Sequence, residues 1–422
     1  MGSSRKKFSG ALHHLEGRDT AHWALLGLSR RMAQAALSPR NSTIAKRCMM
    51  TKQKKWLKRI LLALLALVLL LALALAGYVA YLQTGYYRIP DGETLTVQTP
   101  QLEPLVPGQD YTALTYNIGF GAYGPDYSFF MDTGTMVDGT PVQGEWGKAI
   151  SEDSVRANTM GALETVADQN PDLILLQEVD VKADRSHLVN QCDLLRRGLP
   201  GYGSVYASNF HTRYLLYPFH DPHGAVEAGL LTFSRYAVDE AVRRSYPVDE
   251  DFFVKFTDLD RCFAQLRIPV EGGGELVLIN SHMSAYDEGG TVRARQLEML
   301  CQVMESEYQQ GNYVIVGGDF NHALGEGMAE AFESGQQLPS WVAQLTDADL
   351  PEGFSIQRAE NEYQTPTCRT ADIPWEPGVN YTTVLDGFLV SENVSATAQN
   401  IDTNFAYSDH NPVKLTFRLA AQ

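Results

Sequence analysis

Cysteine is scarce in this 422-residue sequence, and the few cysteines are scattered. The five lie at positions 48, 192, 262, 301 and 368, with no CxxC pair and no spacing typical of metal ligands. These absences argue against a zinc ribbon and against a dense disulfide framework. With 44% hydrophobic and 20% charged residues, the chain has a globular composition and is too long for a disulfide-stapled miniprotein.

Acidic residues are almost missing from residues 1–59, which hold 14 Lys and Arg against Glu16 and Asp19. The rest of the chain has 20 basic and 48 acidic side chains, a net charge of −28, so a basic head precedes an acidic body. Residues 60–82, ILLALLALVLLLALALAGYVAYL, contain no charge at all. As a helix they would extend roughly 34 Å at about 1.5 Å per residue, enough to cross a bilayer core.

Basic residues flank this apolar run on one side. Arg88 alone follows it closely, whereas five basic residues come just before it: Lys52, Lys54, Lys55, Lys58 and Arg59. The positive-inside rule therefore predicts a single-pass cell-membrane protein with its N-terminus in the cytoplasm and residues 83–422 outside. A cleavable signal peptide is the alternative, because residues 72–74 and 74–76 form A-x-A-like sites, although the run exceeds a usual h-region. Both interpretations export the body.

The remaining segments divide the chain further. Residues 1–59 are predicted to be a disordered cytoplasmic tail. Met49-Met50 followed by TKQKKWLKR resembles a natural start, which leaves an upstream extension as the alternative for residues 1–48. Residues 83–107, with four prolines, are predicted to be a stalk, and residues 108–422 a folded domain.

Short apolar runs alternate with amphipathic segments in residues 108–422. One helix is predicted to start at the N-cap Ser151 and stop at Asn170-Pro171, and another to cover Thr291–Gln309. The predicted strands are Thr112–Tyr116, Leu173–Gln177, Gly229–Phe233, Phe263–Ile268, Leu276–Ser281, Tyr313–Val316, Val384–Val390 and Val413–Phe417. Many strands with few helices predict two sheets with helices on the outside.

Polar side chains recur where these strands end. One carboxylate after a strand is commonly a turn former or a helix cap, but a full set would converge on one rim of a sheet pair. Oxygen ligands suit Mg²⁺, Mn²⁺ or Ca²⁺ rather than zinc, and two histidines can shuttle protons. No nucleophilic Ser or Cys motif occurs, which favours direct attack by water. The set is Asn117, Glu178, His282, Asp319, Asn321, Asp386, Asp409 and His410.

These segments, in the order YN, QE, SH, GDFN, LDGF and SDHNP, resemble the endonuclease/exonuclease/phosphatase superfamily over residues 111–417. The resemblance implies a four-layer α-β-β-α sandwich of two mixed sheets, here preceded by one transmembrane helix. It also implies metal-dependent cleavage of a P–O bond by a catalytic domain over residues 108–422. Members of the superfamily include deoxyribonucleases, apurinic-site endonucleases, sphingomyelinases and inositol-polyphosphate 5-phosphatases.

The resemblance implies a metal site and a pair of residues that act on the phosphate. Asn117 and Glu178, with Asp409 adjacent, resemble the ligands of a divalent ion, Mg²⁺ or else Mn²⁺ or Ca²⁺. Asp319 and Asn321 resemble the pair that positions the attacking water and the phosphoryl oxygens.

The resemblance also implies roles for both histidines. His410, oriented by Asp386, resembles the general base or the electrostatic partner of the phosphate. His282 resembles a second histidine that contacts the phosphate or assists the leaving group; its own carboxylate partner is not identifiable from the sequence.

Several other residues are weaker candidates. His211, Arg213 and Tyr214 fall where related enzymes contact substrate, Arg235 has a phosphate contact and a salt bridge as alternatives, and surface or turn positions are expected for His187, His220, His223 and Gly272–Gly274.

The substrate is not fixed by these motifs. The acidic body repels polyanions, its basic clusters are small, and a membrane tether would hold the site beside lipid head groups. A lipid-type or small phosphoester is therefore favoured over a nucleic acid as the partner. A cell-surface nuclease is the alternative enzyme, and a catalytically silent binding domain on the same fold is the non-enzyme alternative.

Overall fold

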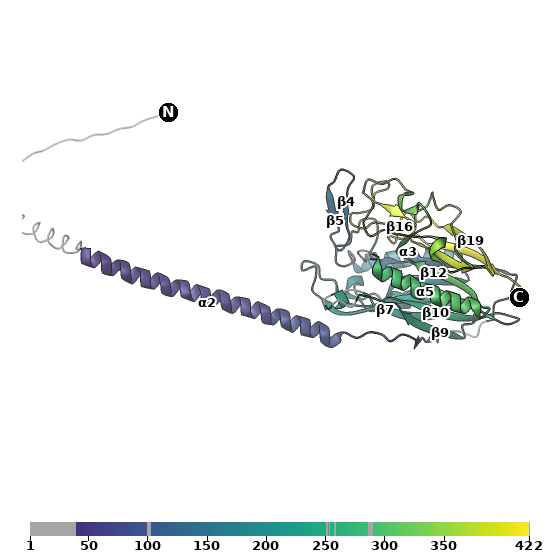
Figure 1. Cartoon of the computed structure of the whole chain (residues 1–422), viewed down its shortest axis with the longest axis horizontal. Coiled ribbons are helices and arrows are strands. Elements are labelled where there is room, and N and C mark those ends of the chain that lie inside the picture. Colours follow the sequence, from purple (N-terminus) through teal and green to yellow (C-terminus); the bar gives the residue numbers. More distant parts are fainter. Residues whose placement is uncertain are drawn as a thin grey trace, which may run out of the picture. The chain divides into compact units, whose positions relative to one another are not determined.

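The computed structural model describes residues 39–98, 103–249, 252, 254–256, 259–285 and 290–421 (Figure 1). The chain forms two compact units, Met1–Ala80 and Tyr81–Gln422. Helix α2 (Pro39–Gly85) includes the whole apolar run and is long and apolar enough to cross a membrane. Residues 39–59, expected to be disordered, are helical; the rest of the predicted tail lies outside the described residues.

Two seven-stranded mixed sheets make up most of the second unit. The first has the order β1 (Glu93–Thr94), β9 (Glu240–Ser245), β10 (Cys262–Pro269), β11 (Glu275–His282), β12 (Tyr313–Asp319), β18 (Asp386–Ser391) and β15 (Phe354–Ile356). The second has the order β19 (Val394–Asn400), β20 (Val413–Leu419), β3 (Asp110–Asn117), β6 (Leu173–Asp180), β8 (Gly224–Ser234), β7 (Gly203–Leu215) and β2 (Val97–Gln98). Each sheet has a parallel pair, β11–β12 and β3–β6, among antiparallel neighbours.

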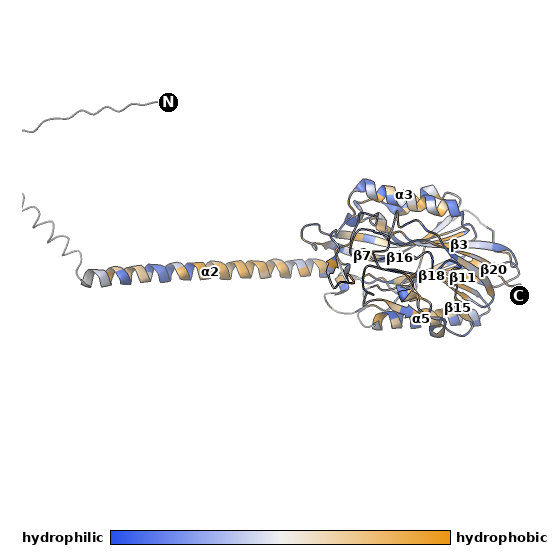
Figure 2. Ribbon diagram, turned by 90° about the horizontal axis from the view of Figure 1, so that it is seen from above, coloured by the Kyte–Doolittle hydropathy of each residue, from blue (hydrophilic) through white to orange (hydrophobic). Residues whose placement is uncertain are grey.

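Each predicted strand is present, and side-chain alternation along the strands explains how the sheets are buried on both faces. In β6, Leu173 and Leu175 pack into the core between the two sheets, whereas Ile174 and Leu176 pack toward α3 (Glu152–Gln169) and α4 (Gln191–Gly198). Helix α5 (Thr291–Gln309) covers the outer face of the first sheet. Figure 2 shows α3 and α5 on opposite sides of the strands, which confirms the four-layer sandwich.

Local capping accounts for the ends of the helices. Ser151 is the N-cap of α3, its hydroxyl accepts a hydrogen bond from Ser154 N at 3.0 Å, and Asn170 ends the helix in the left-handed region. Helix α5 has the predicted bounds, and Gly311 follows it with φ 88°. The described residues of this unit also form three two-stranded pairs: β4 (Thr133–Thr135) with β5 (Pro141–Gln143), β13 (His322–Leu324) with β14 (Ala343–Leu345), and β16 (Cys368–Arg369) with β17 (Thr382–Thr383).

The predicted stalk, residues 83–107, joins the edges of both sheets where it is described. Strand β1 pairs with β9 in one sheet and β2 pairs with β7 in the other. Farther along, Leu105 N donates to Pro269 O at 2.9 Å. The strands that were not predicted, among them β7, β9 and β19, carry polar residues that break up the apolar pattern.

Candidate active site

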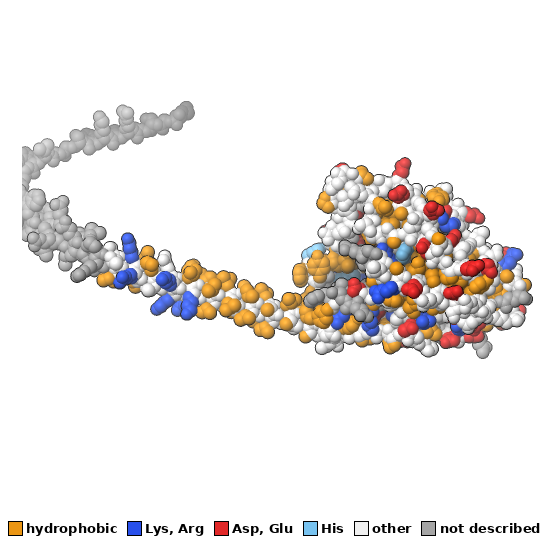
Figure 3. Space-filling view, in the orientation of Figure 1, with side chains coloured by type: hydrophobic (Ala, Val, Ile, Leu, Met, Phe, Trp, Pro, Cys, Tyr) orange, Lys and Arg blue, Asp and Glu red, His pale blue; other side chains and the backbone are white. Residues whose placement is uncertain are grey.

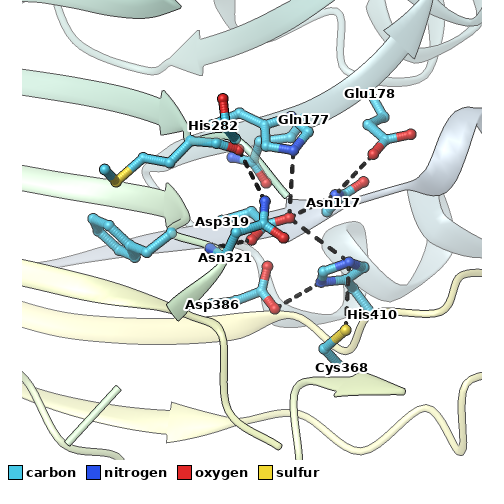
Figure 4. Close-up of polar contacts among 12 residues, drawn as sticks. Asn117, Gln177, Glu178, His282, Asp319, Asn321, Cys368, Asp386 and His410 are labelled. Carbon is cyan, nitrogen blue, oxygen red and sulfur yellow. Dashed lines mark hydrogen bonds and ion pairs between the residues drawn. The ribbon is translucent and has the colours of Figure 1, made fainter. Parts of the chain in front are cut away.

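The strand ends that carry the predicted polar residues meet at one rim of the sandwich. Strand register places His282 level with Asp319 and Asp319 opposite Asp386, while Asn117 ends β3 beside Gln177 of β6. Figure 4 shows these side chains turned toward one another, although they come from both sheets. The convergence expected from the sequence is present.

Asp319 lies at the centre of this rim. Its Oδ2 accepts a hydrogen bond from Asn117 Nδ2 at 3.0 Å and lies 3.5 Å from His282 Nε2 and 3.7 Å from His410 Nε2. Its Oδ1 accepts from the backbone N–H of Asn321 at 2.9 Å. Only 1% of Asp319 is exposed. The carboxylate nearest to His282, which could not be identified from the sequence, is therefore Asp319.

The pKa values of the two histidines, His282 and His410, are shifted in opposite directions. Burial disfavours charge on His410, but the negative charges of Asp386 and Asp319 outweigh this effect and hold the pKa of His410 well above its usual value. Asp386 Oδ2 accepts from His410 Nδ1 at 2.8 Å. Burial, with the positive charges of Arg261 and His410, holds the pKa of His282 well below its usual value. Two imidazoles whose pKa values are shifted in opposite directions thus flank the same carboxylate.

Asp386 is itself held by its surroundings. Its backbone N–H donates to Thr367 Oγ1 at 3.0 Å, which fixes the start of β18. Burial raises the pKa of its carboxyl to about 6, against the lowering effect of His410. We assign the ionic form to the pair, because Oδ2 of Asp386 faces the Nδ1–H of His410.

Glu178 reaches the rim through a β-bulge. The register of the β6–β8 pairing shifts between Leu176 and Val179, and Glu178 in this segment has φ 54°. A left-handed conformation costs a non-glycine residue about 1–3 kcal/mol and is common at functional sites. Glu178 Oε1 lies 3.4 Å from Asn117 Nδ2, so the bulge brings the carboxylate to the end of the neighbouring strand.

Asp409 lies near the same pair. Ser408 Oγ is within hydrogen-bonding distance of both Asn117 O (2.8 Å) and Asp409 Oδ1 (3.3 Å). Burial raises the pKa of Glu178, and the charge of Asp409 raises it further, while Arg185 opposes both. Burial also raises the pKa of Asp409. Glu178 and Asp409 are partly buried, and the Asn117 amide turns its Nδ2 toward Glu178 while its Oδ1 accepts from Gly119 N at 3.0 Å. The two carboxylates suit a hard divalent cation, because the cation would offset their like charge.

A second group of metal-ligating side chains adjoins the first through the hydrogen bond from Asn117 Nδ2 to Asp319 Oδ2. One ligand atom from each of Asp319, Asp386 and His410 lies within 4.8 Å of the others. In this group, however, Asp386 and His410 are already joined by the 2.8 Å hydrogen bond. The arrangement is that of an oriented imidazole next to a carboxylate.

The weaker candidates lie away from this cluster. Three histidines contact backbone carbonyl oxygens, at 2.7, 3.2 and 2.7 Å: His187, His220 and His223. His211 stacks on Tyr87 with ring centroids 3.8 Å apart, and Arg235 lies 3.9 Å from Asp172 in an ion pair. The run Gly272–Gly274 forms the turn between β10 and β11.

Sequence reasoning missed residues that support the rim from behind. Gln177 Nε2 donates to Asn280 Oδ1 at 2.8 Å and so ties the two sheets together. Arg185 is buried and makes a forked contact with Asp180, at 2.8 and 3.1 Å. Gln177 and Asn280 lie inside the predicted strand motifs LILLQE and LVLINSH, but their role is visible only from their contact with each other across the two sheets.

The fold and the rim together define a phosphoesterase- or nuclease-type α/β sandwich. The model of the Endonuclease/Exonuclease/phosphatase family matches residues 114–410, and the chain belongs to this family. Its members are metal-dependent hydrolases that act on phosphoester bonds. No curated protein matches the chain.

Several solved structures are similar to this chain. They include a truncated TDP2 from Caenorhabditis elegans, with 17% identity and a TM-score of 0.45, covering 74% of this chain and 98% of that one. An endonuclease/exonuclease/phosphatase from Beutenbergia cavernae has 17% identity and a TM-score of 0.49, covering 74% and 72%. D. rerio TDP2 complexed with a single-strand DNA product has 15% identity and a TM-score of 0.46, covering 74% and 99%.

Proposed function

We propose that this chain is a divalent-metal-dependent phosphoesterase that hydrolyses a phosphodiester or phosphomonoester at the rim described above. The observation that carries the proposal is the buried Asp319 between two imidazoles with opposite protonation preferences. Titratable groups whose surroundings push their pKa values apart are typical of acid–base sites.

The metal would be held by Glu178, Asn117 and Asp409. Bound there, Mg²⁺ or Mn²⁺, with Ca²⁺ as a further candidate, would neutralise charge on the phosphoryl oxygens and lower the pKa of a bound water. Asp319 would accept a hydrogen bond from the attacking water and hold it in line. The second member of that pair is Asn321, whose Nδ2 donates to Met283 O at 2.9 Å and so fixes the amide beside Asp319.

The two histidines would divide the proton chemistry. Asp386 holds the Nδ1–H of His410, so that Nε2 is the atom left to face the substrate and to donate or accept a proton. His282 stays neutral because it is buried near positive charge, and it can hydrogen-bond a phosphoryl or leaving-group oxygen without adding a second cation.

We further propose that the enzyme is exported and anchored by α2, with residues 1–59 cytoplasmic, residues 83–107 as its link to the membrane, and a lipid-type or small phosphoester as substrate. The apolar helix and the acidic body, whose net charge of −28 disfavours long polyanions, support this choice. A cell-surface nuclease of the same family is the second candidate, because the same rim chemistry serves nucleic acids.

The test is an assay of the full chain in detergent against duplex DNA, RNA, sphingomyelin, phosphatidylinositol and inositol phosphates, with Mg²⁺, Mn²⁺ or Ca²⁺. Glu178→Gln is the matched inactive control. A nuclease that grips several phosphates would lose affinity with a slope of roughly −0.9 per phosphate in log affinity against log salt. Degradation of duplex DNA with a slope of several units, and none of the other substrates, would reject the lipid preference; no hydrolysis of any would reject the activity.

A further inference from the structure

The loop between β7 and β8 displays apolar side chains to solvent. Phe219 is 82% exposed, Tyr217 59% and Leu216 41%, and we call residues 216–219 the apolar loop. The stretch 214–219, YLLYPF, holds no charged residue, although a fifth of the chain is charged. Figure 3 shows hydrophobic side chains gathered where this loop lies. A folded domain rarely exposes several large apolar side chains together unless they contact a partner.

The base of the apolar loop is fixed by hydrogen bonds and ring contacts. Asp221 Oδ2 accepts a hydrogen bond from the backbone N–H of Gly147 at 2.8 Å. His223 N donates to Tyr217 O at 3.2 Å, and the rings of Tyr217 and Phe130 have centroids 5.5 Å apart. The exposed side chains are thus preorganised, so a partner surface can bind them without the cost of ordering the loop.

Strand β7, which leads to the apolar loop, runs along the residues that follow the apolar run. His211 stacks on Tyr87 with ring centroids 3.8 Å apart. Two residues farther on, the guanidinium carbon of Arg213 lies 4.9 Å from the ring centre of Tyr81, and Tyr214 N donates to the hydroxyl of Tyr81 at 3.4 Å. Since Tyr81 belongs to the apolar run 60–82, β7 runs toward the end of that run, and the apolar loop follows from there.

The apolar loop also lies at the rim end of the second sheet. Asp180, two residues after Glu178 on β6, pairs with Ala228 of β8, which in turn pairs with Phe210 of β7. From Phe210 the strand continues to Leu215, roughly 15 Å at about 3.3 Å per residue. Because β7 and β6 are both antiparallel to β8, they run in the same direction. The loop therefore projects past the level of Glu178 on the side where β6 ends at the rim.

We propose that the apolar loop is a membrane-contact site, in which Tyr217 and Phe219 enter the boundary between lipid head groups and acyl chains. Aromatic side chains favour this boundary. The contacts with Tyr81 keep the loop beside the bilayer that α2 would cross, so lipid is the surface it meets at high local concentration. The inference rests on the proposed anchoring by α2 and adds a second contact, which turns the rim toward lipid head groups.

The test uses the full chain reconstituted in vesicles of phosphatidylcholine and phosphatidylglycerol. An environment-sensitive fluorophore is attached to Phe219→Cys in a chain that also carries Cys48→Ser and Cys301→Ser, because the other three cysteines are buried. Phosphatidylcholine with a doxyl group on its acyl chain serves as the quencher. Tyr363→Cys is the matched control, since Tyr363 is 56% exposed and follows β15 at the edge of the first sheet opposite to β1.

We expect the label at Phe219 to emit at shorter wavelength in vesicles and to be quenched by the doxyl lipid, while the label at Tyr363 stays in water. A label at Phe219 that stays in water would overturn the inference. Emission at shorter wavelength without quenching by the doxyl lipid would mean that a second copy of the chain covers the loop, and would also overturn it.

Kinetics give a second measurement on the same loop. Phe219→Ser should raise the KM for the best lipid substrate in vesicles by about tenfold, the scale of losing one aromatic side chain from an apolar contact. The KM for bis(p-nitrophenyl) phosphate, a soluble phosphodiester, should not change, and Tyr363→Ser should change neither value. An unchanged KM for the vesicle lipid in Phe219→Ser would contradict a role of the loop in presenting the substrate.

The outcomes separate this inference from the proposed function. If the wild-type chain hydrolyses a phosphoester while the label at Phe219 stays in water, the inference is wrong and the proposed activity stands. If the doxyl lipid quenches the label but the chain hydrolyses no phosphoester, the membrane contact stands and the proposed activity is wrong.

Discussion

The hydrogen bond between Asp386 and His410 allows a quantitative test of how the rim works. Asp386 Oδ2 and His410 Nδ1 are 2.8 Å apart and both residues are buried. His410→Gln removes the titrating Nε2 and should lower kcat by about 10²-fold or more, or about 2.7 kcal/mol of transition-state stabilisation. Asp386→Asn keeps the shape but removes the charge, and a smaller loss of about 10–10²-fold is expected because the imidazole loses its orientation.

The double variant carries the decisive information. Since Asp386 acts through His410, Asp386→Asn should cost nothing more once His410 has been replaced. The negative charge of Asp386 raises the pKa of His410. In Asp386→Asn alone this charge is missing, so the limb of the pH–rate profile that belongs to His410 should move to lower pH.

The assay is kcat from initial rates between pH 5 and pH 9, at saturating Mg²⁺, on the best substrate of the panel. Asp168→Asn, on the exposed side of α3, is the matched control and should retain full activity. If the losses of the two single variants multiply in the double variant, Asp386 and His410 act independently, and the orienting role of Asp386 is refuted.

Four further outcomes are expected. EDTA should abolish hydrolysis, Mg²⁺ or Mn²⁺ should restore it, and folded Glu178→Gln should lose most activity; full activity in chelator would contradict the metal site. Burial raises the pKa of the Cys368 thiol to about 12, so Cys368→Ala should change kcat only a few-fold, and an inactive variant would point to thiol chemistry. Burial lowers the pKa of His223 to about 3, so its contribution to stability is complete above pH 6.5 and is lost by about 1.4 kcal/mol per pH unit as the pH falls from there toward 3. In denaturant unfolding, the free energy of unfolding of His223→Asn should therefore fall less steeply with decreasing pH than that of the wild type, and equal slopes would argue against the shift. A tag after Gln422 should be cleaved by protease on intact cells and a tag before Lys52 protected, whereas the reverse pattern would contradict the proposed topology.

The sequence alone determined the features that depend on local patterns. Helical periodicity and end signals predicted the bounds of α5, and the Ser151 N-cap predicted the start of α3. Runs rich in apolar residues predicted the central strands, because strands buried on both faces hold few polar side chains and these need partners, as Gln177 and Asn280 have in each other. The polar residues that end those runs were predicted to converge on one rim, because a strand end is where a side chain can leave the core.

Only the tertiary structure decided what those residues do to one another. Asn117 and Asp319 are 202 positions apart in the sequence yet hydrogen-bonded, and no local pattern records such a pair. The opposite pKa shifts of His282 and His410 depend on burial and on which charges face each ring. Neither the burial nor the neighbouring charges can be read from the motifs SH and SDHNP. The buried Nε and Nη1 of Arg261, which have no hydrogen-bond partner among the described residues, are likewise invisible in the sequence, since Asp260 adjoins this residue in the chain but lies 3.4 Å from Arg88 and 3.5 Å from His211 in the fold.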